Sequence, residues 1–203
     1  CVYLSNTINM RFAIFTLLFS LIIVPAKAQR FVADDAAFTK LNTLRIKANH
    51  TGMKILGAWG AANIVGGVTG ALVATDKEWQ SFHTMNALWG AVNLGIAGMG
   101  YLGARKEAKE SMACGTMLNR YESGKRMFLL NAGLDVVYIT SGAALVGYAD
   151  DMNNPAEWRG FGKSIMMQGV FLFIFDGTMF ALHQHQNKNW YKLLDGICVT
   201  GNG

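Results

Sequence analysis

Four long apolar stretches dominate this chain and restrict what it can fold into. They cover about residues 54–74, 82–102, 127–148 and 164–183, and each has roughly the 20 residues that a helix needs to cross a bilayer. The interiors of the first two carry no charge, which argues against a soluble helical bundle with one solvated face. With 52% apolar and only 15% charged residues, the composition is also unlike that of ordinary soluble domains. We therefore predict an all-α fold, a four-helix transmembrane bundle.

The N-terminal region has the pattern of an export signal. Met10-Arg11 precedes an apolar run at 12–24, and Ala26-Lys27-Ala28 then offers a small-x-small cleavage site. The run is too short to span a bilayer comfortably, so we predict a cleaved signal at 10–28, with residues 1–9 as an upstream extension foreign to the mature protein. The predicted location is the bacterial cell (inner) membrane, with several crossings.

Residues 29–52 are predicted to form an interfacial segment. Phe38, Leu41 and Leu44 recur roughly at helical spacing among basic residues, after Asp34-Asp35 as a cap. This pattern predicts a short amphipathic helix on the membrane surface that breaks near Gly52. The four-helix membrane domain would then occupy 53–183, followed by a polar tail at 184–203.

The chain contains an internal repeat. TGALV at 69–73 has a counterpart in SGAALV at 141–146, and EWQSF at 78–82 has one in EWRGF at 157–161. These matches predict two related helical hairpins that keep the same orientation in the membrane. Chance similarity between two Gly/Ala-rich helices is the alternative interpretation.

Glycines in the first two stretches predict close helix packing. Gly66-x-x-x-Gly70 lies in the first stretch, and the series Gly95, Gly98 and Gly103 lies in the second. Small residues let helix backbones approach each other in lipid, where they favour association.

Two signals disagree about orientation. A cleaved signal places the mature N-terminus, residues 103–126 and the tail outside, but most basic residues lie on that same side. The positive-inside rule would place that side in the cytoplasm. The net charge of +5 arises at helix flanks, where lipid headgroups are the expected partner, so no nucleic acid is predicted.

Four polar residues lie near the middle of the predicted membrane helices. Asn63 and Asp135 follow Lys54 and Arg126 at the same spacing, and Asn93 and Asp176 precede later basic residues at matched spacings. These four residues are therefore expected at similar depth. A carboxylate at the bilayer centre is costly, so both aspartates are expected to face the bundle interior. If they are neighbours, repulsion and desolvation favour a proton shared between them, as in a proton or cation site. Hydrogen bonding that merely holds helices together is the alternative.

A second polar face lies on the second apolar stretch. Asn86, Trp89, Gly90 and Asn93 fall at i, i+3, i+4 and i+7, which places two amides and an indole on one side of a helix. Two interpretations are open. The face lines the same interior as the aspartates and belongs to a solute-binding site, or it packs against the partner helices.

The histidines give one metal candidate. His50, His183 and His185 would lie at one membrane face and His83 at the other, so no pair brackets the bundle core as two axial haem ligands do. His183-x-His185 with His50 could bind a divalent metal, but histidines at helix ends are more often interfacial. We predict no cofactor. No acyl-transfer triad, phosphate loop or HExxH motif is present to support catalysis.

One segment resembles a known group of proteins. Residues 82–98 (FHTMNALWGAVNLGIAG), together with Trp59-Gly60-x-x-Asn63, are similar to an uncharacterised family of small multi-pass membrane proteins from Bacteroidota-type bacteria. The similarity covers most of the mature chain. It implies a membrane location and no known activity, and it transfers no catalytic residue.

Three functional hypotheses follow from these patterns. The first is a proton, cation or small-solute site centred on Asp135 and Asp176 and flanked by Asn63 and Asn93, in a transporter-like or channel-like assembly. Four helices make a small pathway, so a homodimer is a natural form for it. The second is a non-catalytic accessory or scaffold protein whose polar residues fix helix packing for a membrane protein partner. An integral membrane enzyme is the third.

Overall fold

The computed structural model describes the backbone of residues 35–200 and the side chains of residues 36–194. The regular structure in this part of the chain is helical throughout. In order, the elements are α2 (Asp35–Val73), α3 (Lys77–Glu107), α4 (Cys114–Gly147), the short 3-10 helix η1 (Ala149–Asp151), α5 (Pro155–His185) and α6 (Asn187–Thr200). The predicted export signal at 10–28 and the upstream residues 1–9 lie outside the described residues.

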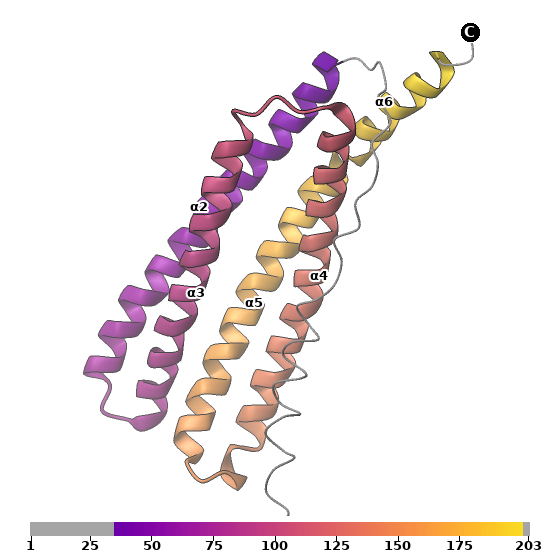
Figure 1. The fold of residues 1–203 in the computed structure, drawn as a ribbon. Coiled ribbons are helices and arrows are strands. Elements are labelled where there is room, and N and C mark those ends of the chain that lie inside the picture. The colour runs from indigo at the N-terminus through magenta and orange to yellow at the C-terminus, as the bar shows by residue number, and fades with distance from the viewer. Residues whose placement is uncertain (1–34, 201–203) are drawn as a thin grey trace, which may run out of the picture.

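Four long helices lie side by side, and α6 continues beyond one end of them (Figure 1). α2 packs along α3, α4 packs along α5, and α3 also packs against α5. Short connections turn the chain at one end of the molecule. Asp76 caps α3 there by accepting hydrogen bonds from the backbone N–H groups of Glu78 and Trp79 at 3.0 and 3.1 Å. Pro155 begins α5, a position where its missing N–H costs nothing.

Three helical segments are long and apolar enough to cross a membrane. They are Ala36–Val73, Cys114–Gly147 and Pro155–Leu194. The prediction of an all-helical fold with membrane-spanning potential is thus confirmed for the described residues. α3 does not reach the same hydropathy, because glycines and amide side chains lower its average. A fourth crossing therefore stays a prediction.

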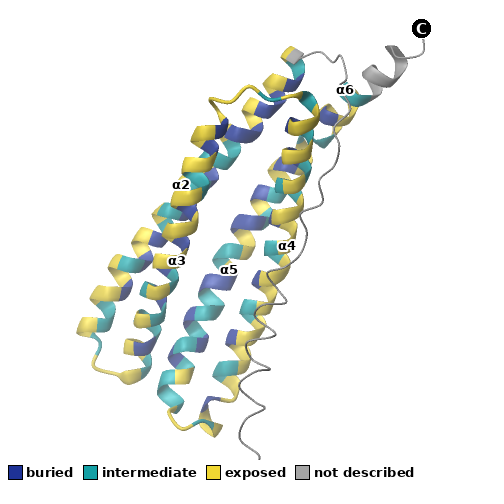
Figure 2. Cartoon of the chain, viewed as in Figure 1, coloured by how far each residue is buried: buried dark blue, intermediate teal, exposed yellow. Residues whose placement is uncertain are grey.

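The burial pattern is the reverse of that in a water-soluble protein. Large apolar side chains cover the outer faces of the helices (Figure 2), and Leu72, Met99 and Leu130 are each at least 70% exposed. Amide and carboxyl side chains are buried inside instead: Asn63, Asn86, Asn93, Asp135, Gln168 and Asp176. Soluble monomers rarely expose apolar surface on this scale, whereas in lipid such surface needs no cover.

The predicted break at Gly52 is wrong, and so is the separate surface helix before it. α2 runs without interruption through Gly52. The glycine leaves room for α5 there, since a Cβ atom would lie 2.8 Å from the sulfur of Met179. The first turns of α2 bury one face, which includes Phe38 and Leu41, and leave the other face, which includes Lys40 and Leu44, exposed. Phe38 contacts Tyr121 and Trp190 in an aromatic cluster that joins α2, α4 and α6.

Glycine does bring helices into close contact, but mostly at other positions than those predicted. A Cβ atom on Gly60 would lie 2.8 Å from the carbonyl oxygen of Gly90, and one on Gly90 would lie 2.7 Å from that of Gly60. The other helix pair has the same reciprocal arrangement, at 2.6 Å in both directions, between Gly142 and Gly162. The predicted packing glycines Gly66, Gly95, Gly98 and Gly103 face open space, and only Gly70 is in tight contact, against the His83 ring.

The glycine contacts generate a stability prediction. Gly90→Ala is expected to lower the free energy of unfolding by about 1–3 kcal/mol, because the added methyl group must push two backbones apart. Gly95→Ala is the matched control on the same helix, since nothing lies within 4 Å of its Cβ position. Thermal melting of the purified protein in detergent compares the two. Equal melting temperatures would show that the α2–α3 contact is not tight.

Candidate functional site

A fully buried glutamine joins three helices in the middle of the bundle. Gln168 of α5 accepts hydrogen bonds at Oε1 from Trp59 Nε1 (2.9 Å) and Asn93 Nδ2 (3.2 Å). Its Nε2 donates to Asn63 Oδ1 (2.8 Å) and Asn86 Oδ1 (3.2 Å). The amide can form two bonds through each of its polar atoms, and all of these are used.

The rest of this network is also satisfied within the protein. Ser164 donates from Oγ to Asn86 Oδ1 at 2.6 Å, and Asn63 donates from Nδ2 to the backbone carbonyl of Trp59 at 2.8 Å. The Trp59 ring stacks on Phe171, with centroids 4.0 Å apart and planes 7° apart. Because each partner relies on the same buried amide, the network fixes α5 against α2 and α3 in one register.

The two predicted aspartates meet between α4 and α5. Both are buried, with exposed fractions of 3% for Asp135 and 5% for Asp176. Their carboxyl groups are hydrogen-bonding neighbours, and the side chain of Asn131 lies beside Asp176. The second carboxyl oxygen of Asp135, Oδ2, has no hydrogen-bond partner among the described residues.

Glycines on the same helix faces explain why the aspartates come together. Gly142 lies two helical turns after Asp135, and Gly169 lies two turns before Asp176. A Cβ atom on Gly169 would be 3.1 Å from the Asp135 carbonyl oxygen. The lack of side chains at these positions lets α4 and α5 approach closely on the side of the carboxyl pair that leads to η1.

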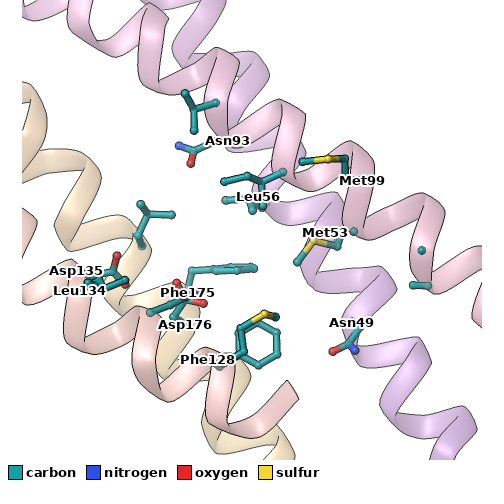
Figure 3. A pocket seen from close by; sticks show the side chains of 18 of the residues that line it. Asn49, Met53, Leu56, Asn93, Met99, Phe128, Leu134, Asp135, Phe175 and Asp176 are labelled. Carbon is teal, nitrogen blue, oxygen red and sulfur yellow. The ribbon is translucent and has the colours of Figure 1, made fainter. Parts of the chain in front are cut away.

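A cavity of about 610 Å³ lies beside the carboxyl pair, between the α2–α3 and α4–α5 pairs. Figure 3 shows Asp135 and Asp176 on one side of it, with Met53, Leu56 and Asn93 of α2 and α3 across from them. The remaining lining is mainly apolar, and its polar members are Asn49, Asn131, Glu107 and Arg120. Pockets of this size, apolar with a few convergent polar groups, are typical ligand sites.

Contacts between α3 and α4 close both ends of this cavity. At one end the rings of Trp89 and Tyr138 meet edge to face, with centroids 5.2 Å apart and planes 73° apart. At the other end Glu107 forms ion pairs with Arg120 (3.1 Å) and with the buried Arg45. Between these contacts the two helices diverge.

The structure separates the predicted site residues into two groups. Asp135 and Asp176 come together at the cavity, where Trp89 and Asn93 also contribute to the lining. Asn63 and Asn86 belong to the Gln168 network, which Asn93 also joins. The sequence left open whether the amides belong to a binding site or hold helices together. In the structure Asn63, Asn86 and Asn93 form hydrogen bonds between helices through Gln168.

The three candidate metal-binding histidines are not grouped within residues 36–194. His183 is buried in the interior, with Nδ1 2.8 Å from the Met179 carbonyl oxygen, and His50 stacks on Tyr101. His185 is exposed at the end of α5. No group of three or more His, Cys, Asp or Glu side chains in this region is placed to hold a metal ion.

Several site residues were missed from the sequence. Arg45 was grouped with the basic residues of the predicted surface helix and Glu107 was not singled out, although the two form a buried ion pair at the end of the cavity. The signal for Arg45 was its spacing: it lies two turns before Gly52 on the face that continues into the core. Nothing comparable marked Asn131, which lies one turn before Asp135 in an ordinary apolar stretch.

The Gln168 network makes a prediction of its own. Gln168→Leu is expected to lower the free energy of unfolding by about 1–3 kcal/mol, because it leaves buried amides and an indole N–H without partners. Gln184→Leu, at an exposed position on the same helix, serves as the control. Thermal melting in detergent measures both. If the Gln168→Leu protein were as stable as the wild type, the network would not contribute to the stability of helix packing.

Comparisons with known proteins give a family but no function. No curated protein and no solved structure matches the chain. Residues 55–177, more than half of the chain, match a family of unknown function, DUF6992. The matched range contains the Gln168 network and both aspartates of the carboxyl pair, whereas Arg45 precedes it. The chain therefore belongs to DUF6992, a family whose function is unknown.

Proposed function

We propose that the protein is a multi-pass membrane protein in which all four long helices cross the bilayer. α3 supplies the fourth crossing because it packs along α2 and has no Asp, Glu, Lys or Arg between Glu78 and Arg105. Its 31 residues extend for about 46 Å at 1.5 Å per residue, more than the ~30 Å hydrocarbon core. A helix of that length that packs along a membrane-spanning helix would cross the bilayer at the same depth as that neighbour.

The same proposal treats the two helix pairs as related units. Each contains one reciprocal glycine contact, Gly60 with Gly90 and Gly142 with Gly162. Each second helix also begins with a tryptophan that meets a phenylalanine edge to face: Trp79 with Phe82 at 82° and Trp158 with Phe161 at 86°. These shared details support the sequence repeat over chance similarity.

The function that the geometry supports best is binding of a proton or cation at Asp135 and Asp176, as a component of membrane transport. The observation that carries this proposal is the pair itself: two buried carboxyls in hydrogen-bond contact beside a cavity, with one oxygen unpaired. An ionised carboxylate only accepts hydrogen bonds, so contact between two carboxyls requires a proton on one of them. No ion pair to Lys or Arg compensates either group in the described part of the chain.

This arrangement couples a proton to a second positive charge. While the cavity holds no cation, the shared proton keeps the pair at a single negative charge. A monovalent cation that takes the place of this shared proton leaves the pair with the same single negative charge, so that one proton leaves for each cation that binds. Binding of cation and proton would therefore be mutually exclusive, which is the basis of exchange across a membrane.

A scaffold role is the second candidate, and a specific observation favours it. The Gln168 network has no free hydrogen-bonding positions on its central amide, so its chemistry is spent on helix packing. The exposed Gly95 and Gly98 of α3 also leave a smooth outer face on which another membrane helix could pack. Under this hypothesis the protein would hold a partner and move no ions.

Chemical labelling tests the carboxyl pair directly. A hydrophobic carbodiimide reacts with protonated carboxyls, so it is expected to modify Asp135 or Asp176 and to lose this reaction as pH rises. Asp135→Asn combined with Asp176→Asn should abolish the modification, while Asp150→Asn, at an exposed carboxyl near the opposite turn, should not. Mass spectrometry of labelled peptides locates the adduct. Absence of any adduct at the pair in folded wild-type protein would refute the proposed site.

Reconstitution distinguishes transport from scaffolding. In vesicles with an imposed potential, wild-type protein is expected to move protons or monovalent cations, and either single Asp→Asn variant is expected to reduce that flux at least tenfold. The scaffold hypothesis instead predicts no flux in any vesicle and altered co-purification of a membrane partner in the variants. Folded variants whose flux equals that of wild type would end the transport proposal.

A further inference from the structure

The side of the cavity between α3 and α4 is open. Its rim consists of side chains that line the cavity and are also exposed on the outer surface: Val92, Ile96 and Met99 from α3, and Met127 and Leu134 from α4. These lie between the Trp89–Tyr138 contact and the Glu107–Arg120 ion pair, which close the two ends. The opening is thus lateral and bordered by apolar side chains.

In a bilayer this opening faces lipid, since Val92 and Met99 lie on the charge-free part of α3. A hydrated ion would have to lose most of its water to pass such a rim, whose exposed side chains are apolar. A molecule that already partitions into the hydrocarbon meets no such barrier. Access from the side therefore selects a lipid-soluble ligand.

The wall of the cavity opposite this opening favours a positively charged ligand. Asp135 and Asp176 lie at its depth, and Asp135 Oδ2 is buried without a partner. Arg120 is the cation among the lining residues, and it is already paired with Glu107 and Glu110. A lipid acyl chain in the cavity would bring the carboxyl pair no compensating charge, whereas a protonated amine beside the pair would offset its negative charge.

The remaining wall selects for an apolar or aromatic body. Phe128 and Phe175 provide ring faces on the side of the carboxyl pair, and Met53 and Met99 provide adaptable contacts across the cavity from it (Figure 3); Trp89 adds another ring to the lining. About 610 Å³ is far more space than a bare metal ion or a proton fills. The volume suits a small organic molecule.

We propose that the cavity binds a lipid-soluble organic cation, a protonated amine on an apolar or aromatic body, which enters from the bilayer between α3 and α4. The amine contacts the carboxyl pair and the body fills the space between the helix pairs. This inference rests on the proposed function and names its cation.

Three small probes with the same ring system test the charge requirement. 1-Naphthylmethylamine is the cation, 1-naphthylmethanol is its neutral counterpart, and 1-naphthylacetate is the anion. With protein in lipid nanodiscs, and empty nanodiscs as the blank, fluorescence anisotropy is expected to show saturable binding of the amine and at least tenfold weaker binding of the other two. Equal binding of amine and alcohol would overturn the assignment.

Variants test the location of the bound amine. Asp135→Asn is expected to weaken amine binding at least tenfold, because it removes the unpaired carboxyl oxygen, while Asp150→Asn leaves it unchanged. Both proteins are checked for folding by thermal melting. Amine affinity that survives Asp135→Asn in folded protein would place the ligand elsewhere.

The rate of amine association tests the lateral entry route. Tryptophan at both Val92 and Met99 narrows the rim and is expected to slow amine association at least fivefold, whereas Leu72→Trp on the outer face of α2 leaves it unchanged. An unchanged rate in the rim variant would exclude the lateral route.

Carbodiimide labelling separates failure of this inference from failure of the proposed function. Bound amine is expected to protect the carboxyl pair from the reagent. Labelling of the pair without amine binding or protection would refute the organic cation while the proton site stands. Absence of labelling in folded protein would refute both.

Discussion

Contact between glycine backbones is the constraint on which the rest of the structure depends. Gly60 with Gly90 and Gly142 with Gly162 bring the helices of each pair closer than any side chain would allow. At that separation a short amide or carboxyl can reach a neighbouring helix, so the interior can be polar without water. Larger residues at these positions would separate the helices and leave the same polar groups without partners.

The polar interior divides into two parts with different chemistry. Around Gln168, donors and acceptors are matched and the result is a rigid junction of α2, α3 and α5. Between α4 and α5, two carboxyl groups face each other, and both only accept hydrogen bonds when ionised. A proton or another cation is needed to offset their repulsion. The first arrangement explains how the fold is held, and the second is where chemistry can take place.

The sequence predicted much of this architecture and less of the site. Apolar stretch lengths gave the helical fold, and the rarity of charge in membrane helices drew attention to Asp135 and Asp176. Gly52 was misread as a break because a glycine lowers helix propensity, while its packing against Met179 depends on a helix distant in sequence. Gly95 and Gly98 show the same limit: a small-residue pattern does not say which side of a helix faces its partner. Arg45 was placed at the surface because its partner Glu107 is distant in sequence, and only the fold brings the two side chains together.

The way α4 is attached has a mechanical consequence. Every hydrogen bond of Gln168 goes to α2 or α3, and α4 takes no part in them. α4 packs mainly on α5, and between its contacts with α3 at Tyr138 and Arg120 no amide clamp spans the gap. α4 is therefore the one long helix that the Gln168 network does not hold, and its close contact with α5 holds it instead. Changes in the width of the cavity would be absorbed by the helix that also carries Asp135, so that the shape of the space and the position of its charge vary together.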